Sequence, residues 1–371
     1  MKGENSVKPK QMPDFMLFVV TLLLLAIGII MVFSASYVVA KTRYADGFYF
    51  LKRQLLWALI GVVGMTTVMK IKYTKFKKWA TPLFGLAVFL LILVLIPGVG
   101  ISVKGSTRWL GIGNLSFQPS EVAKLALVIF LAKNLSDQGE QIRNFFRGFL
   151  PQLLLVGVVC GLILVQPDLG TAVTIAGTSY LIFLVAGSRS SHLVGLALLG
   201  IALVGLAIYV APYRMERFTA FLDPWADPLG SGFQTIQSLY AVGSGRLFGM
   251  GLGQGKQKFL YLPEQHTDFI YAVLSEELGF LGSSFVLILF FIFIWRGLKI
   301  AAKAPDVFGA LLAVGITVMI ALQALINIGV VTGCLPVTGI TLPLVSFGGS
   351  SLTLTLLGIG ILLNISCYAR E

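Results

Sequence analysis

The sequence predicts an all-α polytopic membrane protein, a single domain over residues 1–371 with about ten transmembrane helices. Of its residues 57% are hydrophobic and only 12% are charged, and the mean hydropathy is +0.90. So few polar side chains cannot cover a soluble globule of this size. The net charge of +12 would suggest nucleic acid as a partner of a soluble protein. In a membrane protein, anionic and phosphorylated lipids fit better, so we expect no nucleic-acid partner.

Ten charge-poor windows approach the roughly 20 apolar residues that a helix needs to cross the hydrocarbon core. They cover residues 15–38, 54–69, 80–97, 117–135, 150–166, 170–187, 192–211, 270–295, 308–331 and 350–368. The fourth is the weakest because Glu121 and Lys124 interrupt it, and nine spans are the alternative. The first uncharged run is too long for a signal-peptide core, which predicts a retained first span.

Ten spans place both chain termini on one side of the membrane. The connection between the second and third windows is crowded with basic residues, namely Lys70, Lys72, Lys75, Lys77 and Lys78. The positive-inside rule therefore predicts that both termini are cytoplasmic. The large loop 212–267 then lies outside, between helices 7 and 8, together with most of the acidic residues.

The outer loop ends in two carboxylates and an imidazole, Glu264, His266 and Asp268, at the mouth of the eighth span. A carboxylate at a lipid–water boundary is partly desolvated, which makes it a stronger general base. The alternative is that Thr267 or Asp268 only caps the following helix. Further along, Glu276 and Glu277 either line a pore or pair with a nearby cation.

Three cations are predicted near the same face: Arg53, Arg108 beside Trp109, and Lys124. Lys124 follows Glu121 by three residues on a helix, so a mutual ion pair is one interpretation. The other is that Arg108 and Lys124 bind a pyrophosphate at the membrane surface. Pro119 suits a first helical turn, whose free N–H groups favour negative charge.

Three segments have unusual backbone requirements. The glycines from Gly243 to Gly255 either form structural turns or contact a ligand. Asp168 either caps a helix or lines a site. The stretch 336–351, which contains Ser346, is either a compact turn or a re-entrant loop, because free backbone at membrane depth must be buried or line a watery cavity. Three scattered cysteines and two histidines predict neither a zinc site nor disulfides.

Several of these motifs together resemble one family. They are RWLGIGNLSFQPSEVAKL, QPDLGT, the loop that ends in TDF, SEELGF and VTGCLPVTGITLPLVSFGGSS. In this combination the chain resembles the SEDS family of shape, elongation, division and sporulation proteins over nearly its whole length. It is most similar to the branch of FtsW and stage V sporulation protein E, and less to RodA.

The resemblance implies a ten-span peptidoglycan glycosyltransferase that polymerises lipid II on the outer face of the bacterial cytoplasmic membrane, for cell division or spore cortex synthesis. It implies a class B penicillin-binding protein and other divisome or sporulation membrane proteins as partners. The aspartate of the family's TDF motif is Asp268, the expected catalytic carboxylate. The residues expected to bind substrate are Arg53, Arg108, Trp109, Lys124, Asp168, Arg246, Lys256, Glu264 and Ser346.

Two points stay open at this stage. A divalent cation, Mg²⁺ or Mn²⁺, would be held mainly through substrate oxygens, since the sequence has no dedicated carboxylate cage. A lipid II flippase and a scaffold that only recruits a penicillin-binding protein are the alternative functions. The clustering of charges on one face, with no matching broken helices in the two halves, argues against a transporter.

Overall fold

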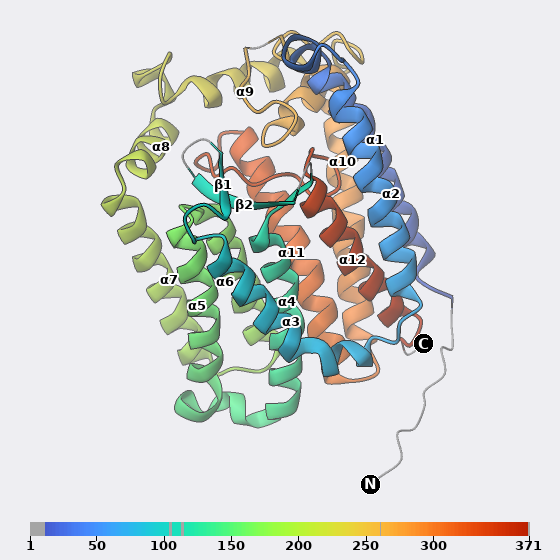
Figure 1. The fold of residues 1–371 in the computed structure, drawn as a ribbon, viewed down its shortest axis with the longest axis vertical. Helices are drawn as coiled ribbons and strands as arrows, with labels where there is room; N and C mark the ends of the chain where they lie inside the picture. The colour runs from blue at the N-terminus through green and yellow to red at the C-terminus, as the bar shows by residue number, and fades with distance from the viewer. Residues whose placement is uncertain (1–11, 104–105, 113–114, 260, 370–371) are drawn as a thin grey trace.

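The computed structural model describes residues 12–103, 106–112, 115–259 and 261–369. Long helices run side by side along its longest axis, and shorter elements lie across one end (Figure 1). The long helices are α1 (Phe15–Tyr44), α2 (Tyr49–Met69), α3 (Thr74–Leu93), α4 (Pro119–Gln138), α5 (Leu150–Val165), α6 (Leu169–Val185), α7 (Ser190–Val210), α10 (Ile270–Ala302), α11 (Val307–Val331) and α12 (Gly349–Ser366).

Every predicted span coincides with one of these helices. Seven of the described helices are long and apolar enough to cross a membrane, and α6 is apolar but only 17 residues long. Charged residues at the start of α2 and within α4 lower the hydropathy of the remaining two. The multi-pass membrane fold is therefore confirmed, whereas the count of ten spans stays a prediction.

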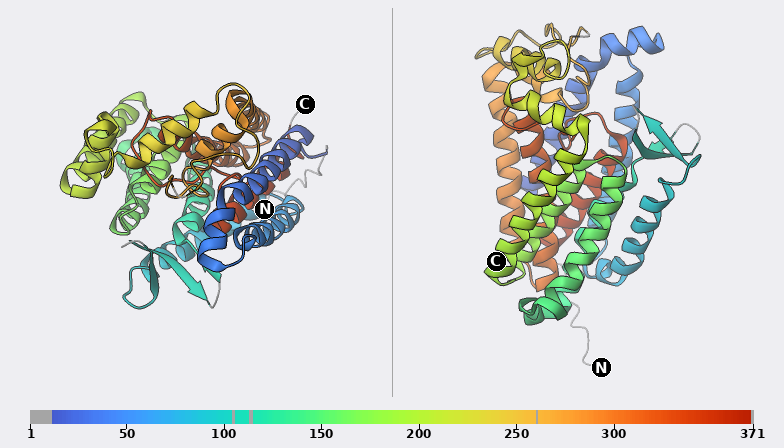
Figure 2. Two further views of the ribbon diagram at one scale, coloured as in Figure 1. Left: turned by 90° about the horizontal axis from the view of Figure 1, so that it is seen from above. Right: turned by 90° about the vertical axis from the view of Figure 1, so that its left-hand side faces the viewer.

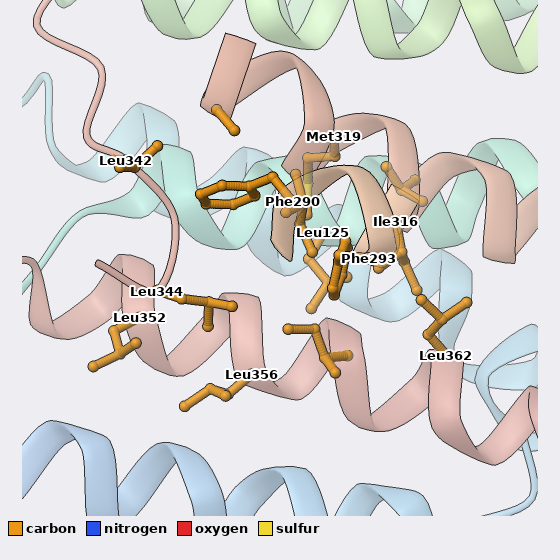
Figure 3. Packing of buried hydrophobic residues seen from close by; sticks show 14 of the residues in the cluster. Leu125, Phe290, Phe293, Ile316, Met319, Leu342, Leu344, Leu352, Leu356 and Leu362 are labelled. Carbon is orange, nitrogen blue, oxygen red and sulfur yellow. The ribbon is translucent and has the colours of Figure 1, made fainter. Parts of the chain in front are cut away.

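The core lies between α4, α10, α11 and α12. Figure 3 shows Leu125, Phe290, Phe293 and Met319 among the buried side chains clustered there. Small residues bring neighbouring helices close: a Cβ on Gly360 of α12 would lie 2.6 Å from the carbonyl oxygen of Met65 in α2. Close backbone approach of this kind is a common way for helices to associate in lipid, where no hydrophobic force drives them together.

Helix α7 packs differently from the others. Leu193 is its only buried residue, so nearly all of its apolar surface faces outward. In a bilayer that surface contacts lipid. Helix α7 is thus attached to the bundle mainly through α6 and α8 (Pro212–Leu222).

The two described chain ends lie together. The Asp14 backbone N–H donates to Ser366 Oγ at 2.9 Å, and the Asp14 carboxylate pairs with Arg296 near the end of α10. The lysine-rich connection between α2 and α3 is at this same end, because Tyr73 bonds Asn364 of α12 and Asp306. The start of α10, with Asp268, is consequently at the opposite end of the bundle.

Two regions contain structure that the span pattern does not predict. An antiparallel sheet in the order β1 (Gly100–Val103), β2 (Ser106–Ile112), β3 (Leu115–Phe117) joins α3 to α4 and projects from the side of the bundle (Figure 2). The loop after α7 contains α8, the short helix η3 (Pro224–Ala226) and α9 (Phe233–Ser244). The short helices η1 (Gly139–Arg143) and η2 (Phe145–Phe149) precede α5 at the other end.

Candidate active site

A cavity of about 290 Å³ opens at the end of the bundle opposite the described termini, and we call it the polar cavity. Its walls come from α2, β2, α4, the start of α6, the turn before α10 and the segment 339–351. Seven of the ten site residues predicted from the sequence line it: Arg53, Arg108, Trp109, Lys124, Asp168, Glu264 and Asp268. The fold thus gathers charges of both signs around one hollow.

The backbone that carries Asp268 is held from two sides. Asn327 of α11 donates its side-chain N–H groups to the carbonyl oxygens of Asp268 and Ile340, both at 2.7 Å. Ser346 Oγ donates to Thr267 O at 2.6 Å, and the Phe347 N–H donates to His266 O at 2.9 Å. Helix α10 begins at Ile270 with Phe269 in the N-cap position, and the Thr267 hydroxyl donates to Glu264 O instead of capping the helix.

The segment between α11 and α12 folds back into the bundle. It has no regular helix between Thr332 and Gly348, yet Leu342, Leu344 and Val345 are buried. Two of its backbone groups bond to side chains: the Leu342 N–H donates to Ser346 Oγ at 2.8 Å, and Gln54 of α2 donates to Ser346 O. This supports the re-entrant interpretation over a compact surface turn.

Ser346 holds backbone on both sides of it. Its hydroxyl accepts the Leu342 N–H and donates to Thr267 O, and it does not line the polar cavity. The structure thus gives Ser346 a role in positioning the backbone beside Asp268, and its substrate contact stays a prediction.

Arg108 connects the sheet to the turn between α5 and α6. Its guanidinium donates to Gln166 O at 2.9 Å and to Pro167 O, and it lies 3.4 Å from Asp168 Oδ2. Asp168 caps α6 by accepting the Thr171 N–H at 3.0 Å, so the capping interpretation is correct, and the same carboxylate also lines the cavity. Since Arg108 has five N–H donors, these bonds leave some for a ligand.

Lys124 is buried with its partner. Its ammonium lies 2.8 Å from Glu121 Oε1 and donates to Gln323 Oε1 of α11 at 2.9 Å. The predicted ion pair is therefore present, and Lys124 at the same time lines the polar cavity. An ammonium has three N–H donors, so one is available beyond these two contacts.

The remaining cation marks the rim of the polar cavity. Arg53 is exposed and lies over the Tyr49 ring, 4.8 Å from its centroid. Glu264, on the other side, adopts a left-handed backbone conformation with φ +53°, and its carboxylate accepts the Thr267 hydroxyl at 2.9 Å. The turn ahead of α10 is thus fixed by Glu264 as well.

Arg246 and Lys256 lie outside the polar cavity, in a glycine-rich segment that packs against a break in α10. Gly279, with φ +69° and ψ −167°, interrupts the helix. The freed groups of α10 pair with the segment, as in the bonds from Met250 N to Glu276 O and from Phe280 N to Arg246 O. This favours the structural interpretation of these glycines, and a substrate role for Arg246 and Lys256 stays a prediction.

The two acids of the SEELGF motif, Glu276 and Glu277, also hold the glycine-rich segment against α10. Glu277 forms a buried ion pair with Lys258 at 2.7 Å and accepts the Ser34 hydroxyl of α1. Glu276 accepts the backbone N–H of Lys256 at 2.8 Å. Of the two interpretations of these acids, pairing with a cation is correct for Glu277, and Glu276 holds loop backbone instead.

Gly249→Ala is expected to destabilise the protein by about 1–3 kcal/mol. Gly249 has φ +80°, and a Cβ there would collide with the Glu277 carbonyl oxygen. The measurement is thermal unfolding in detergent. The matched control is Gly243→Ala in α9, where a Cβ meets nothing and helix propensity favours alanine. Equal unfolding temperatures for the two variants would contradict the packing described for this segment.

If Asp268 is the catalytic residue that the family resemblance implies, Asn327→Leu should lower kcat by up to about 10²-fold with little change in KM, because a catalytic group displaced by about 1 Å loses that much. Leucine removes both donors that hold the Asp268 and Ile340 carbonyls. The conservative variant Asn327→His, which retains a ring N–H donor, should recover part of kcat. A variant whose kcat and KM both match the native values would disprove the positioning role.

Sequence reasoning missed several residues of the polar cavity. Gln118 Nε2 lies 3.4 Å from Asp168 Oδ2, and Gln323 holds Lys124. Trp57, Ser350 and Ser351 complete the wall. The only sequence signal was that Gln118 directly precedes Pro119, which occupies the first turn of α4 as predicted. Neutral polar residues in apolar helices are, like charged ones, candidate site residues.

Comparison with known proteins gives full-length matches. The model of the FtsW/RodA/SpoVE family, described as cell cycle protein, matches residues 14–371. Stage V sporulation protein E of Bacillus subtilis is 56% identical, covering 97% of this chain and 99% of that protein. The probable peptidoglycan glycosyltransferase FtsW of Geobacter sp. (strain M18) is 44% identical, covering 96% and 97%.

Two solved structures share the fold. One is a chain of a peptidoglycan synthase complex studied for its coordination of polymerization and crosslinking, with a TM-score of 0.79, 34% identity, and 95% and 97% of the two chains covered. The other is the rod shape determining protein RodA of Thermus thermophilus, with a TM-score of 0.72, 30% identity, and 97% and 98% covered. The chain therefore belongs to the FtsW/RodA/SpoVE family of multi-pass membrane proteins.

Proposed function

We propose that this protein is a peptidoglycan glycosyltransferase that polymerises lipid II on the outer face of the bacterial cytoplasmic membrane. The observation that carries the proposal is the polar cavity, where Asp268 shares one hollow with Arg53, Arg108 and Lys124. The names of the relatives, glycosyltransferase and synthase among them, support the same chemistry. Division and spore cortex synthesis require the same reaction.

Asp268 acts as the general base. It takes the proton from the C4 hydroxyl of the acceptor sugar, whose oxygen forms a bond to C1 of the donor sugar. The bond from C1 to the pyrophosphate oxygen breaks in the same step, and undecaprenyl pyrophosphate leaves with the electron pair. A single displacement of this kind inverts the configuration at C1.

The cations stabilise the leaving group. Pyrophosphate gains negative charge as its bond to C1 breaks, and fixed donors aimed at that charge lower the barrier. Arg108 and Lys124 are held by protein contacts yet keep N–H donors in reserve, which is the preorganisation that such stabilisation needs. Arg53 at the rim attracts the negatively charged pyrophosphate of incoming substrate.

A divalent cation remains a separate expectation. Within the described parts of the chain, no group of three or more His, Cys, Asp or Glu side chains converges on one point. Mg²⁺ or Mn²⁺ would therefore take most of its oxygen ligands from the substrate pyrophosphate and water, as Mg²⁺ often does.

The positions of the basic residues support an orientation, and a related complex supports a partner. The lysine-rich connection between α2 and α3 lies at the end of the bundle that holds the described termini, and the positive-inside rule places that end in the cytoplasm. The polar cavity then opens outside. A class B penicillin-binding protein, which crosslinks the glycan, is the proposed partner, in keeping with the coordinated polymerization and crosslinking of the related complex.

A lipid II flippase is the alternative function, and the packing of the bundle argues against it. Below the polar cavity the bundle is filled by buried apolar side chains, including Leu125, Met319 and Phe290 (Figure 3). A transporter needs its site near the bilayer midplane with access to both sides. A pure scaffold would leave the buried charges of the polar cavity without a task.

The test is glycan polymerisation from purified lipid II by the native protein, reconstituted with its penicillin-binding partner in vesicles. Glycan strands that disappear with the Asp268→Ala variant would support the enzyme. If lipid II moved across the vesicle membrane and no polymer formed, the flippase function would be supported and the enzyme function would not. If the penicillin-binding partner alone made as much glycan as the two proteins together, the scaffold function would be the one supported.

A further inference from the structure

A groove of about 530 Å³ runs along the half of α1 that is nearer to the end of the bundle with Asp268. We call it the α1 groove. One wall is α1, and the other is the glycine-rich segment that precedes α10 (Figure 1). Most of its lining is aliphatic or aromatic, including Ile30, Val38, Leu252 and Phe259. None of the described residues that line it also lines the polar cavity, so the α1 groove is a separate compartment.

The α1 side of the groove is a stripe of residues that leads to a cation. Ile30, Ser34, Tyr37 and Lys41 follow one another at intervals of four, three and four residues, which places them on one face of the helix. Lys41 lies one turn beyond the groove and is exposed. None of the salt bridges among the described residues involves Lys41. The apolar stripe therefore ends at a positive charge that is open to a ligand.

The length of α1 gives the depth of the groove in the bilayer. Helix α1 begins at Phe15, at the cytoplasmic end in the proposed orientation. A hydrocarbon core about 30 Å thick takes up about 20 residues of a helix, so it ends near residue 35. The groove therefore crosses the outer boundary of the hydrocarbon core, and Lys41 lies at the level of the phospholipid headgroups. The exposed Tyr37 fits this depth, because tyrosine is enriched at the membrane–water interface.

The groove is narrow as well as apolar. Ile30 and Val38 are eight residues apart, about 12 Å along a helix, which gives the groove a mean cross-section of about 45 Å². A helix with its side chains is about 10–12 Å wide and has roughly twice that cross-section. A transmembrane helix of a partner could insert only a row of side chains, whereas a single hydrocarbon chain fits lengthwise.

We propose that the α1 groove binds one acyl chain of an anionic glycerophospholipid, of which phosphatidylglycerol is the simplest example, with the headgroup phosphate at Lys41. The other acyl chain stays in the bilayer. A lysine at headgroup level favours an anionic phospholipid over a zwitterionic one. The bound lipid is a structural ligand and not a substrate, so the proposal does not depend on the proposed function.

The groove adjoins the contacts that attach the glycine-rich segment to α1. Lys258, which lines the groove, donates to Ser34 Oγ at 3.0 Å. Gln265, three residues before Asp268, donates to Ala35 O and to Lys258 O, both at 2.8 Å. A lipid chain between the two walls would therefore add packing at the place where the outer region is fastened to the bundle.

The other wall gains cover from the same chain. Leu252 and Phe259 are 57% and 52% exposed, although both are large apolar side chains. A ligand that binds only the folded segment stabilises it against local opening. We expect the bound phospholipid to hold the glycine-rich segment closed against α1.

The first test measures lipid binding to the full chain by native mass spectrometry, with phosphatidylglycerol and phosphatidylcholine of identical acyl chains. Val38→Trp fills the groove and should weaken binding of both lipids about tenfold or more, since excluding even two methylene groups costs that much. The control is Leu23→Trp, which places the same ring on an exposed part of α1 outside the groove and should bind as the native protein does.

The headgroup is tested with Lys41→Gln. This variant should lower the preference for phosphatidylglycerol over phosphatidylcholine about fivefold, the contribution of one lysine beside anionic lipid. Arg43→Gln removes the same charge two residues further on, from nearly the opposite side of the helix, and should keep the native preference. Both positions are exposed, so this comparison remains decisive even if Val38→Trp does not fold.

Hydrogen exchange in nanodiscs tests the effect on the segment. The Gly253 and Lys256 N–H groups donate to the Glu277 and Glu276 carboxylates at 3.0 and 2.8 Å. Their exchange should slow about tenfold when phosphatidylglycerol is present at ten times its Kd. Val38→Trp should abolish this slowing.

Undecaprenyl pyrophosphate and the penicillin-binding partner serve as competitors, and neither should release the bound phosphatidylglycerol. Release by undecaprenyl pyrophosphate would assign the groove to the glycosyl donor, and release by the partner would assign it to a partner helix. Either result would overturn the proposal, as would native binding by a folded Val38→Trp or a native preference in Lys41→Gln. All these measurements are made without turnover, so the presence or absence of glycan bears on the proposed function alone.

Discussion

Asp268→Asn is expected to lower the rate of glycan polymerisation by about 10²–10⁴-fold, the usual cost of losing general-base catalysis. Asparagine keeps the size of the side chain but accepts no proton. The anchors at this position should survive, because Asn327 bonds the backbone carbonyl of residue 268 and not its side chain. The measurement is the single-turnover rate of polymer formation from lipid II with the penicillin-binding partner present.

A carboxylate elsewhere in the outer region provides the control. Asp46 is partly exposed and pairs with Lys52 at 2.8 Å, a solvent-screened surface contact that contributes little to stability. Asp46→Asn should polymerise at the native rate. If the Asp268→Asn variant were as fast as Asp46→Asn, Asp268 would not be the base, and the mechanism proposed here would fail.

Lys124→Met is expected to have two effects, one on stability and one on catalysis. Removal of the ammonium leaves the Glu121 carboxylate buried without its ion-pair partner, which typically costs about 3–5 kcal/mol of folding free energy. Loss of one electrostatic stabiliser of the leaving pyrophosphate should separately lower kcat by about 10²–10³-fold. Thermal unfolding and the polymerisation rate measure the two effects independently.

The double variant Glu121→Gln with Lys124→Met separates these roles. Neutralising both partners removes the stranded charge, so most of the lost stability should return. The polymerisation rate should stay low, because one of the cations that stabilise the leaving pyrophosphate is still missing. Recovery of both stability and rate would mean that Lys124 is only the partner of Glu121 and that Arg108 carries the charge stabilisation.

The break in α10 explains why the outer region can hold such a site rigidly. Gly279 frees backbone groups of the helix, and these bind the glycine-rich segment, while Glu277 and Lys258 anchor the same segment to Ser34 of α1. The turn with Asp268 lies one element further along, tied to α11 and to the re-entrant segment. The candidate base is thus supported by helices from both halves of the chain.

The sequence by itself determined the features that are written locally. Runs of apolar residues specify helices in lipid regardless of their neighbours, so every predicted window became a helix. Burying the charged residues that interrupt or border those runs is energetically unfavourable, so charges at such positions indicate a functional site. Arg108, Lys124 and Asp268 were predicted on this basis, and they line one cavity. The positions of Pro119 in the first turn of α4 and of Asp168 at the N-cap of α6 could be predicted, because helix ends have local chemical requirements.

Only the tertiary structure decided which side chains meet across the chain. Gln54, nearly 300 residues away in sequence, donates to the carbonyl oxygen of Ser346, whose hydroxyl in turn holds Thr267 O beside Asp268. Arg246 lies at the break at Gly279, where its carbonyl oxygen accepts the Phe280 N–H, and the Lys256 N–H donates to the Glu276 carboxylate. Buried backbone groups that a helix break frees must find partners within the protein. Gln118 and Gln323 became part of the polar cavity through contacts that no local pattern encodes. Hydropathy acts residue by residue, whereas the pairing of polar groups depends on how helices pack, and that is settled only in the folded chain.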